Sequence, residues 1–271
     1  MTASFPRLVA TDLDGTIVRS DGTISARTIA ALSSIERSGA QLVFVTGRPP
    51  RILGDIAAAF GAQGMVLCSN GALIYDMHAD RVIGEHLIPP PELAEAARRL
   101  REAIPEIGLA VESAKGITGD GRYETGAWDD NEAIPRLPDA ELFSRPAAKL
   151  LGRHPWLSAD ELVALASPAV DGVVSVYHSN GRRLVEASAV GVSKASALAD
   201  LAAAAGIPAA AVVAFGDMPN DLPMLAWAGT SYAVANAHPD VLAAADHVIA
   251  SNDEDGVAQV IERLFPHLDH P

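Results

Sequence analysis

Short apolar runs alternate with amphipathic stretches along most of the chain. The runs are Leu8–Thr11, Leu42–Val45, Met65–Leu67 and Ala211–Phe215, with shorter ones at Tyr232–Val234 and His247–Ala250. Between the first two runs, Ile29, Leu32 and Ile35 recur at helical spacing after Ser25, a residue type that caps helices. Strands that alternate with helices predict an α/β fold, a Rossmann-like doubly wound parallel sheet with helices on both faces. In such folds the functional site lies beyond the carboxyl ends of the strands.

The alternation stops between Gly84 and Glu186. The stretch begins with the consecutive prolines Pro89–Pro91 and continues with strand-like fragments that long polar loops separate. The alternation returns after it. We therefore expect residues 84–186 to form a second domain inserted into the first, and residues 1–83 and 187–271 to form one core.

Two features are expected within the inserted domain. Val173–Tyr177 and Arg182–Val185 are predicted to pair as a hairpin across the turn Ser179–Gly181. The segment Gly119–Glu141 is rich in Asp, Glu, Gly and Pro, contains Trp128, and is predicted to be a loop.

The first apolar run ends on two acidic residues, Asp12 and Asp14. Side chains alternate along an extended strand, so both carboxylates face one side and Leu13 faces the other. Carboxylates that close repel each other unless a proton or a cation lies between them, and oxygen ligands on a short loop suit Mg²⁺. Gly15 lets the backbone turn and leaves amide hydrogens that can point at an anion. Taken alone, the stretch fits a plain Asp-Gly turn with solvated acids equally well.

Composition excludes some classes of partner. The chain has 271 residues and a net charge of −14, which argues against binding nucleic acid or anionic lipid through a general basic field. Cys68 is the only cysteine, so no intramolecular disulfide can form and a reducing compartment is suitable. Met1–Pro6 does not resemble a secretory signal, and the longest uncharged apolar stretch, Leu201–Phe215, is broken by Gly206 and Pro208. We expect a soluble cytoplasmic protein with no nucleic-acid or membrane partner.

Four separated motifs give the chain its strongest resemblance. They are Asp12-Leu13-Asp14-Gly15-Thr16, Val45-Thr46-Gly47-Arg48, Lys194, and Gly216-Asp217-Met218-Pro219-Asn220-Asp221. In order and type they resemble the four motifs of the haloacid dehalogenase-like phosphatases, over nearly the whole chain. Asn70-Gly71-Ala72 and Asn236-Ala237 are similar to segments of the cof-like hydrolase branch. The resemblance implies that the core is catalytic and that the inserted domain is an α/β cap that sets substrate specificity.

The resemblance also implies a role for each motif residue. Asp12 would be the nucleophile that forms an aspartyl-phosphate, and Asp14 the general acid and then the general base. Mg²⁺ would be held by Asp12, the backbone carbonyl of Asp14 and Asp217, with Asp221 in a second shell. The phosphate oxygens would bind to the Thr46 hydroxyl, the Leu13 and Gly47 amides, Lys194 and Asn220.

The expected function is Mg²⁺-dependent hydrolysis of a small phosphorylated metabolite: a sugar phosphate, a nucleotide or a phosphorylated cofactor. The alternatives are a phosphomutase or phosphotransferase that uses the same intermediate, and a non-catalytic protein that binds a phosphorylated metabolite. Arg48 and Asn70 have two open interpretations, contact with the substrate or ties between loops. Zinc is disfavoured because no two of the 8 histidines lie at metal-ligand spacing. Substrate identity is expected to reside in the loop Gly119–Glu141, and no pattern indicates the oligomeric state.

Overall fold

The computed structural model describes residues 5–62, 64–125, 134–178 and 183–266. These residues form two compact units. One unit comprises the residues up to Arg48, residues 52–83 and the residues from Ser193 onward, and the other comprises Pro49–Arg51 and Gly84–Val192. No described helix has the length and the apolar character needed to cross a bilayer.

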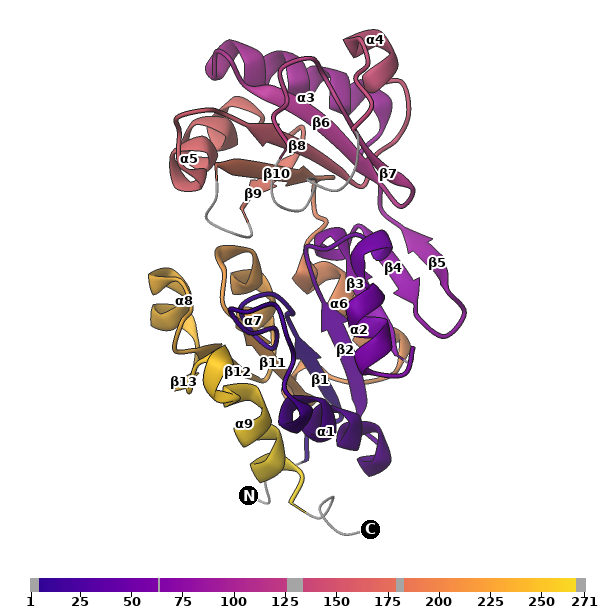
Figure 1. The fold of residues 1–271 in the computed structure, drawn as a ribbon, viewed down its shortest axis with the longest axis vertical. Helices are drawn as coiled ribbons and strands as arrows, with labels where there is room; N and C mark the ends of the chain where they lie inside the picture. The colour runs from indigo at the N-terminus through magenta and orange to yellow at the C-terminus, as the bar shows by residue number, and fades with distance from the viewer. Residues whose placement is uncertain (1–4, 63, 126–133, 179–182, 267–271) are drawn as a thin grey trace. The chain divides into compact units, whose positions relative to one another are not determined.

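The first unit is built on an 8-stranded sheet, with the strand order β13-β12-β11-β1-β2-β3-β4-β5 (Figure 1). Its strands are β1 (Leu8–Thr11), β2 (Gln41–Val45), β3 (Met65–Cys68), β4 (Leu73–Asp76), β5 (Arg81–Glu85), β11 (Val212–Gly216), β12 (Thr230–Val234) and β13 (His247–Ile249). From β13 to β3, every neighbouring pair is parallel. The predicted α/β class with a parallel core is therefore confirmed.

Helices accompany these parallel strands. They are α1 (Ala26–Ile35), α2 (Gly54–Ala59), α6 (Lys194–Ala204), α7 (Leu222–Trp227), α8 (Pro239–Ala244) and α9 (Gly256–Leu264). Of these, α1, α2, α7 and α8 connect consecutive parallel strands, as parallel crossovers require. α1 packs against α9, and α6 packs against α7 (Figure 1). The central strand β1 is buried along its whole length because sheet neighbours and helices cover it. Its carboxyl end is consequently a rigid place from which to present functional side chains.

Two details of the first unit differ from expectation. The sheet is not parallel throughout, because a tight turn at Ser69–Gly71 reverses the chain and β4 pairs antiparallel to β3. The helix that the alternation predicts between the runs Leu42–Val45 and Met65–Leu67 is short: a 3₁₀ turn, Pro50–Ile52, precedes α2, which begins only at Gly54. Glycine has low helix propensity, which explains a boundary at this position.

The second unit is a 5-stranded sheet in the order β7-β6-β8-β10-β9. Its strands are β6 (Gly108–Ser113), β7 (Gly116–Gly119), β8 (Lys149–Arg153), β9 (Ser175–Tyr177) and β10 (Leu184–Ser188), and each pair is antiparallel. α3 (Pro90–Ala103) and α5 (Ala159–Ala169) share one apolar cluster with alternate residues of the sheet. Leu109, Leu150 and Val185 face these helices, whereas Ala110, Leu151 and Leu184 belong to the cluster on the other face.

Two expectations for this unit are corrected. Tyr177 pairs with Glu186 rather than with a residue close to the turn, so β9 and β10 pair in a different register from the predicted hairpin. Register depends on packing against the sheet, which the turn sequence does not reveal. The segment Gly119–Glu141 is not loop throughout, since α4 (Asp139–Leu142) begins within it. The turn Ser179–Gly181 and Trp128 lie outside the described residues.

Candidate active site

Three central strands bring their polar ends to one edge of the first sheet. Asp12 directly follows β1, Thr46 follows β2, and Asp217 follows β11. The Asp12 backbone N–H donates to the Phe215 carbonyl at 3.0 Å, which extends the ladder and fixes Asp12 beside the end of β11. Leu13 is fully buried, as alternation along the chain predicts. Parallel strands therefore gather these side chains at the carboxyl edge, where α/β proteins carry their sites.

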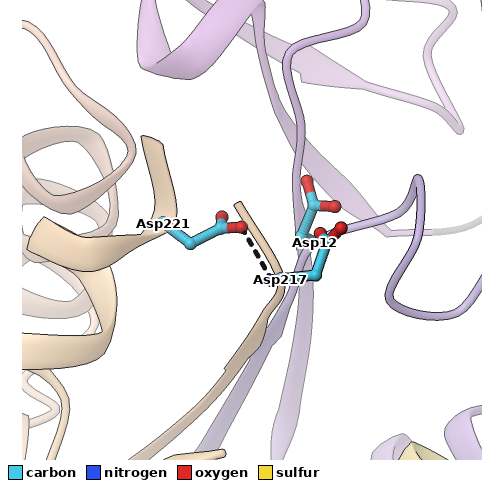
Figure 2. A group of neighbouring side chains, drawn as sticks. All are labelled: Asp12, Asp217 and Asp221. Carbon is cyan, nitrogen blue, oxygen red and sulfur yellow. Dashed lines mark hydrogen bonds between the residues drawn. The ribbon is translucent and has the colours of Figure 1, made fainter. Parts of the chain in front are cut away.

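Three carboxylates form the centre of this edge, those of Asp12, Asp217 and Asp221 (Figure 2). One carboxylate oxygen from each lies within 4.8 Å of the others. Lys194 lies among them, and its Nζ donates to Asp12 Oδ1 and to Asp221 Oδ1, both at 2.6 Å. Lys194 is only 1% exposed, so a solvated surface role is excluded. Three carboxylates and one ammonium leave an excess of negative charge that a cation would neutralise.

The pKa values of the cluster reflect the same excess of negative charge. Burial is the largest effect on Asp12 and, with Asp221 and Asp14 adding to it and Lys194 opposing it, raises its pKa to about 7. Burial likewise raises the pKa of Asp217 well above its ordinary value, with Asp12 contributing. For Lys194, burial alone would lower the pKa, but the carboxylates of Asp12 and Asp221 outweigh it and raise the pKa. Without a cation, the cluster therefore favours protons on its carboxylates.

The arrangement of donors fits Mg²⁺. Asp221 is committed elsewhere: Oδ1 accepts from Lys194, and Oδ2 accepts from the backbone N–H groups of Asp217 and Met218, both at 3.1 Å. Asp217 Oδ1 accepts from the Thr16 hydroxyl at 3.0 Å. Within the described chain, Oδ2 of Asp12 and Oδ2 of Asp217 make no hydrogen bond. Two hard oxygen donors thus remain for a cation, with Asp221 behind them, and such oxygens are what Mg²⁺ prefers.

The raised pKa of Asp12 predicts how stability depends on pH and metal. Its carboxyl titrates near 3.8 in an unfolded chain and at about 7 in the metal-free fold. Between these values the folded state holds a proton that the unfolded state has lost, so this contribution to the free energy of unfolding decreases as pH rises. Mg²⁺ would replace the proton. We expect Mg²⁺ to raise the midpoint of thermal unfolding more at pH 7 than at pH 5, and a larger rise at pH 5 would contradict this.

The loop after Asp14 is shaped to admit Asp217. Gly15 has φ +81°, and a Cβ there would lie 2.3 Å from Asp217 Oδ2, so both backbone conformation and space require glycine. The side-chain amide of Asn236 donates to the Gly15 carbonyl at 2.7 Å and holds the turn. Thr16 orients Asp217, a role that the sequence interpretation missed although a hydroxyl directly after Asp-Gly was a visible signal.

Arg48 forms a bidentate ion pair with Asp14. Its Nε lies 2.8 Å from Asp14 Oδ2 and its Nη2 lies 2.6 Å from Asp14 Oδ1. Nη1 of the same guanidinium lies 2.9 Å from an oxygen of Asp55. Arg48 is buried, whereas the Asp14 side chain is 36% exposed. Two interpretations were left open for Arg48. This geometry corresponds to the second, in which Arg48 links the loop that carries Asp14 to the segment that carries Asp55. Nothing in the sequence marked Asp55.

The expected phosphate-binding groups lie around the same edge. Thr46 is fully buried, and its hydroxyl oxygen accepts from the Arg48 backbone N–H at 3.0 Å, which leaves its O–H able to donate. Leu13 lies in the turn after β1, and Gly47 follows Thr46. Asn220 is buried, and its Nδ2 donates to Asn70 Oδ1 at 2.9 Å. Lys194 begins α6 directly after the N-cap residue Ser193.

Comparison with known proteins places this constellation in a family. Residues 9–261 match the family model of the haloacid dehalogenase-like hydrolases. The chain is 30% identical over 280 residues to 5-amino-6-(5-phospho-D-ribitylamino)uracil phosphatase YbjI of Escherichia coli strain K12, covering 96% of this chain and 97% of that one. It is 29% identical over 275 residues to pyridoxal phosphate phosphatase YbhA of the same strain, covering 97% and 98%.

Solved structures give the same fold. The phosphatase BT1666 from Bacteroides thetaiotaomicron superposes with a TM-score of 0.81 at 23% identity, covering 96% of this chain and 95% of that one. The family model, the curated relatives and the fold agree with the motif resemblance and confirm it. The chain belongs to the haloacid dehalogenase-like hydrolases, and within them to the phosphatases of the cof-like branch.

Proposed function

We propose that the protein is a Mg²⁺-dependent phosphatase that hydrolyses a small phosphorylated metabolite through an aspartyl-phosphate on Asp12. The observation that carries the proposal is the pairing of Asp12 with a buried ammonium, that of Lys194, next to a free oxygen of Asp217. A phosphate monoester is a dianion that repels a carboxylate, so attack requires positive charge and fixed position at the nucleophile. Lys194 supplies the first part of that charge.

The reaction proceeds in two displacements. An Asp12 oxygen forms a bond to phosphorus as the bond to the ester oxygen breaks, and Asp14 gives its proton to the departing alkoxide. A water molecule then attacks the phosphorus of the aspartyl-phosphate and loses a proton to Asp14, which restores Asp12 and releases inorganic phosphate. Asp12, the Asp14 carbonyl and Asp217 would hold Mg²⁺, which when bound would neutralise charge on the phosphate.

The remaining residues bind and orient the phosphoryl group. We assign this role to the Thr46 hydroxyl, the Leu13 and Gly47 amides, Lys194 and Asn220. Asp221 holds Lys194 and the Asp217 loop in place through three hydrogen bonds, so it acts behind the site rather than in it. Both oxygens of Asp14 accept hydrogen bonds from Arg48, so we propose that this ion pair loosens when Asp14 turns to the leaving oxygen.

Two features bear on the substrate. Relatives of similar identity carry the names of different phosphatases, one for pyridoxal phosphate and one for a ribitylaminouracil phosphate, so identity alone does not select a compound. The core residues described above address the phosphoryl group and the metal. We propose that residues 84–186 form the cap that selects the leaving group.

The absence of an intramolecular disulfide suits a reducing compartment such as the cytoplasm.

The experiment that tests the function is release of phosphate from a panel of sugar phosphates, nucleotides, pyridoxal phosphate and a nitrophenyl phosphate. We expect turnover of at least one compound with Mg²⁺ and loss of turnover in excess chelator, with recovery when Mg²⁺ is restored. Full activity in chelator would remove the metal from the mechanism. Transfer of the phosphoryl group to a supplied sugar phosphate without release of phosphate would favour a phosphomutase instead.

A further inference from the structure

A buried segment next to the site has a left-handed backbone, which Asn70 and Gly71 readily adopt and Ser69 disfavours. After β3, Ser69 and Asn70 have φ angles of 49° and 57°, and Gly71 has a φ of 94°. Residues with a Cβ rarely adopt this left-handed region, and serine less often than asparagine. Such conformations persist only where the surroundings hold them, and they gather at functional sites. The left-handed Ser69 therefore calls for an explanation other than local preference.

Hydrogen bonds tie this segment to the loop that follows β2. The Ser69 backbone N–H donates to the Arg48 carbonyl and the Asn70 N–H donates to the Thr46 carbonyl, both at 2.9 Å. On its other side, Gly71 is so close to α6 that a Cβ would lie 2.4 Å from the Ser193 carbonyl oxygen. The segment is thus held between the Thr46 loop and the helix that begins with Lys194.

The side chains of the segment leave polar atoms without partners. Asn70 is 1% exposed, and its Oδ1 accepts from Asn220 Nδ2. Nδ2 of Asn70 and the hydroxyl of Ser69, both buried, make no hydrogen bond to any residue that the structure describes. Leaving a buried donor unpaired is costly, and native proteins contain few such groups. Unpaired donors on a strained segment beside Thr46 indicate a ligand that accepts hydrogen bonds.

We propose that Asn70 is a phosphate-binding residue of this enzyme. Its Oδ1 fixes the carboxamide of Asn220, and its Nδ2 donates to a phosphoryl oxygen of the substrate. A neutral amide can supply two N–H groups to an anion without competing with Lys194 for the carboxylates. The assignment rests on the proposed function, because it requires that a phosphoryl group bind at this edge.

Two substitutions separate this role from a structural one. Asn70→Gly keeps the left-handed backbone and removes the whole side chain, whereas Asn70→Asp keeps an acceptor for Asn220 but replaces the donor with a negative charge. We expect Asn70→Gly to weaken inhibition by inorganic phosphate roughly tenfold to hundredfold, the effect of one hydrogen bond to a charged group. Asn70→Asp should weaken it more, because its carboxylate repels the dianion.

The measurements are the inhibition constant of inorganic phosphate, kcat and KM with a nitrophenyl phosphate, and the midpoint of thermal unfolding. Phosphate binding that weakens from the wild type to Asn70→Gly and further to Asn70→Asp, with Asn70→Gly unfolding near the wild-type midpoint, supports the proposal. A merely structural role predicts that Asn70→Gly lowers the midpoint of thermal unfolding while inorganic phosphate inhibits it with near wild-type affinity, and that result overturns the proposal. Wild-type phosphate binding in both variants also overturns it, and leaves the proposed function standing if the wild type hydrolyses phosphate esters.

Discussion

Replacing Asp12 with asparagine should lower turnover by at least about 10⁴-fold, the scale on which loss of a nucleophile acts in other hydrolases. Asparagine fills the same space but its amide cannot form the acyl-phosphate bond. The loss should occur with every substrate in the panel, since Asp12 acts on phosphorus whatever group departs. Steady-state turnover of a nitrophenyl phosphate and a sugar phosphate measures it.

Stability should not explain the loss. Burial disfavours the Asp12 carboxylate in the metal-free protein, as its raised pKa shows, so a neutral side chain of the same shape should leave the thermal midpoint unchanged or higher. Asp200→Asn is a matched control, because Asp200 is an exposed residue of α6, the helix that begins with Lys194. Asp12→Asn activity within tenfold of this control would mean that Asp12 is not the nucleophile.

Asp14→Asn should separate the two chemical steps. An alkoxide leaves poorly without a proton, whereas a nitrophenolate leaves well by itself. General acid catalysis contributes about 10²–10⁴-fold, so in single turnover the variant should lose about that factor with a sugar phosphate and much less with the aryl ester. Hydrolysis of the aspartyl-phosphate needs Asp14 as a base in both cases. The aryl ester should therefore give a burst of nitrophenolate followed by slow turnover.

The ion pair of Asp14 with Arg48 provides the control for this experiment. If Asp14→Asn acted only by loosening Arg48, then Asp55→Asn, which removes the other carboxylate partner of Arg48, would produce the same change. We expect Asp55→Asn to lower the turnover of both substrates by the same factor and to give no burst of nitrophenolate. Equal losses for the two substrates in Asp14→Asn, again without a burst, would assign Asp14 to loop geometry rather than to proton transfer.

The sequence predicted the core well because each part of it has a local signal. The uninterrupted apolar residues of a strand such as β1 indicate that the strand is buried. The polar residues that follow it indicate where the edge of the sheet lies. The motif order then brought Asp12, Thr46, Lys194 and Asp217 to one edge, because parallel strands share that edge. The antiparallel β4 was missed although Ser69-Asn70-Gly71 carries the same turn residues that predicted the turn at Ser179–Gly181, because the alternation of strands and helices was read as parallel throughout.

Partners distant in sequence were beyond prediction from the motifs. Lys194 carries no local sign that it is buried between two carboxylates, and nothing in the sequence marks Asp55, in the first turn of α2, as a partner of Arg48. The predicted pairing of β9 with β10 is present, but its register was missed for a similar reason, because packing of the sheet rather than the turn sets it. Local pattern thus located the acidic residues, whereas their hydrogen-bond partners depended on packing.

The central claim is that phosphate is transferred first to Asp12, and trapping that intermediate tests it most directly. The Asp14→Asn protein is mixed with Mg²⁺ and a nitrophenyl phosphate, quenched in acid within the burst, digested and examined by mass spectrometry. The account predicts one phosphoryl group on the peptide that contains Asp12, labile to hydroxylamine and absent from a matched variant that also carries Asp12→Asn. A burst of nitrophenolate with no phosphoryl group on that peptide, or a phosphoryl group on another residue, would contradict it.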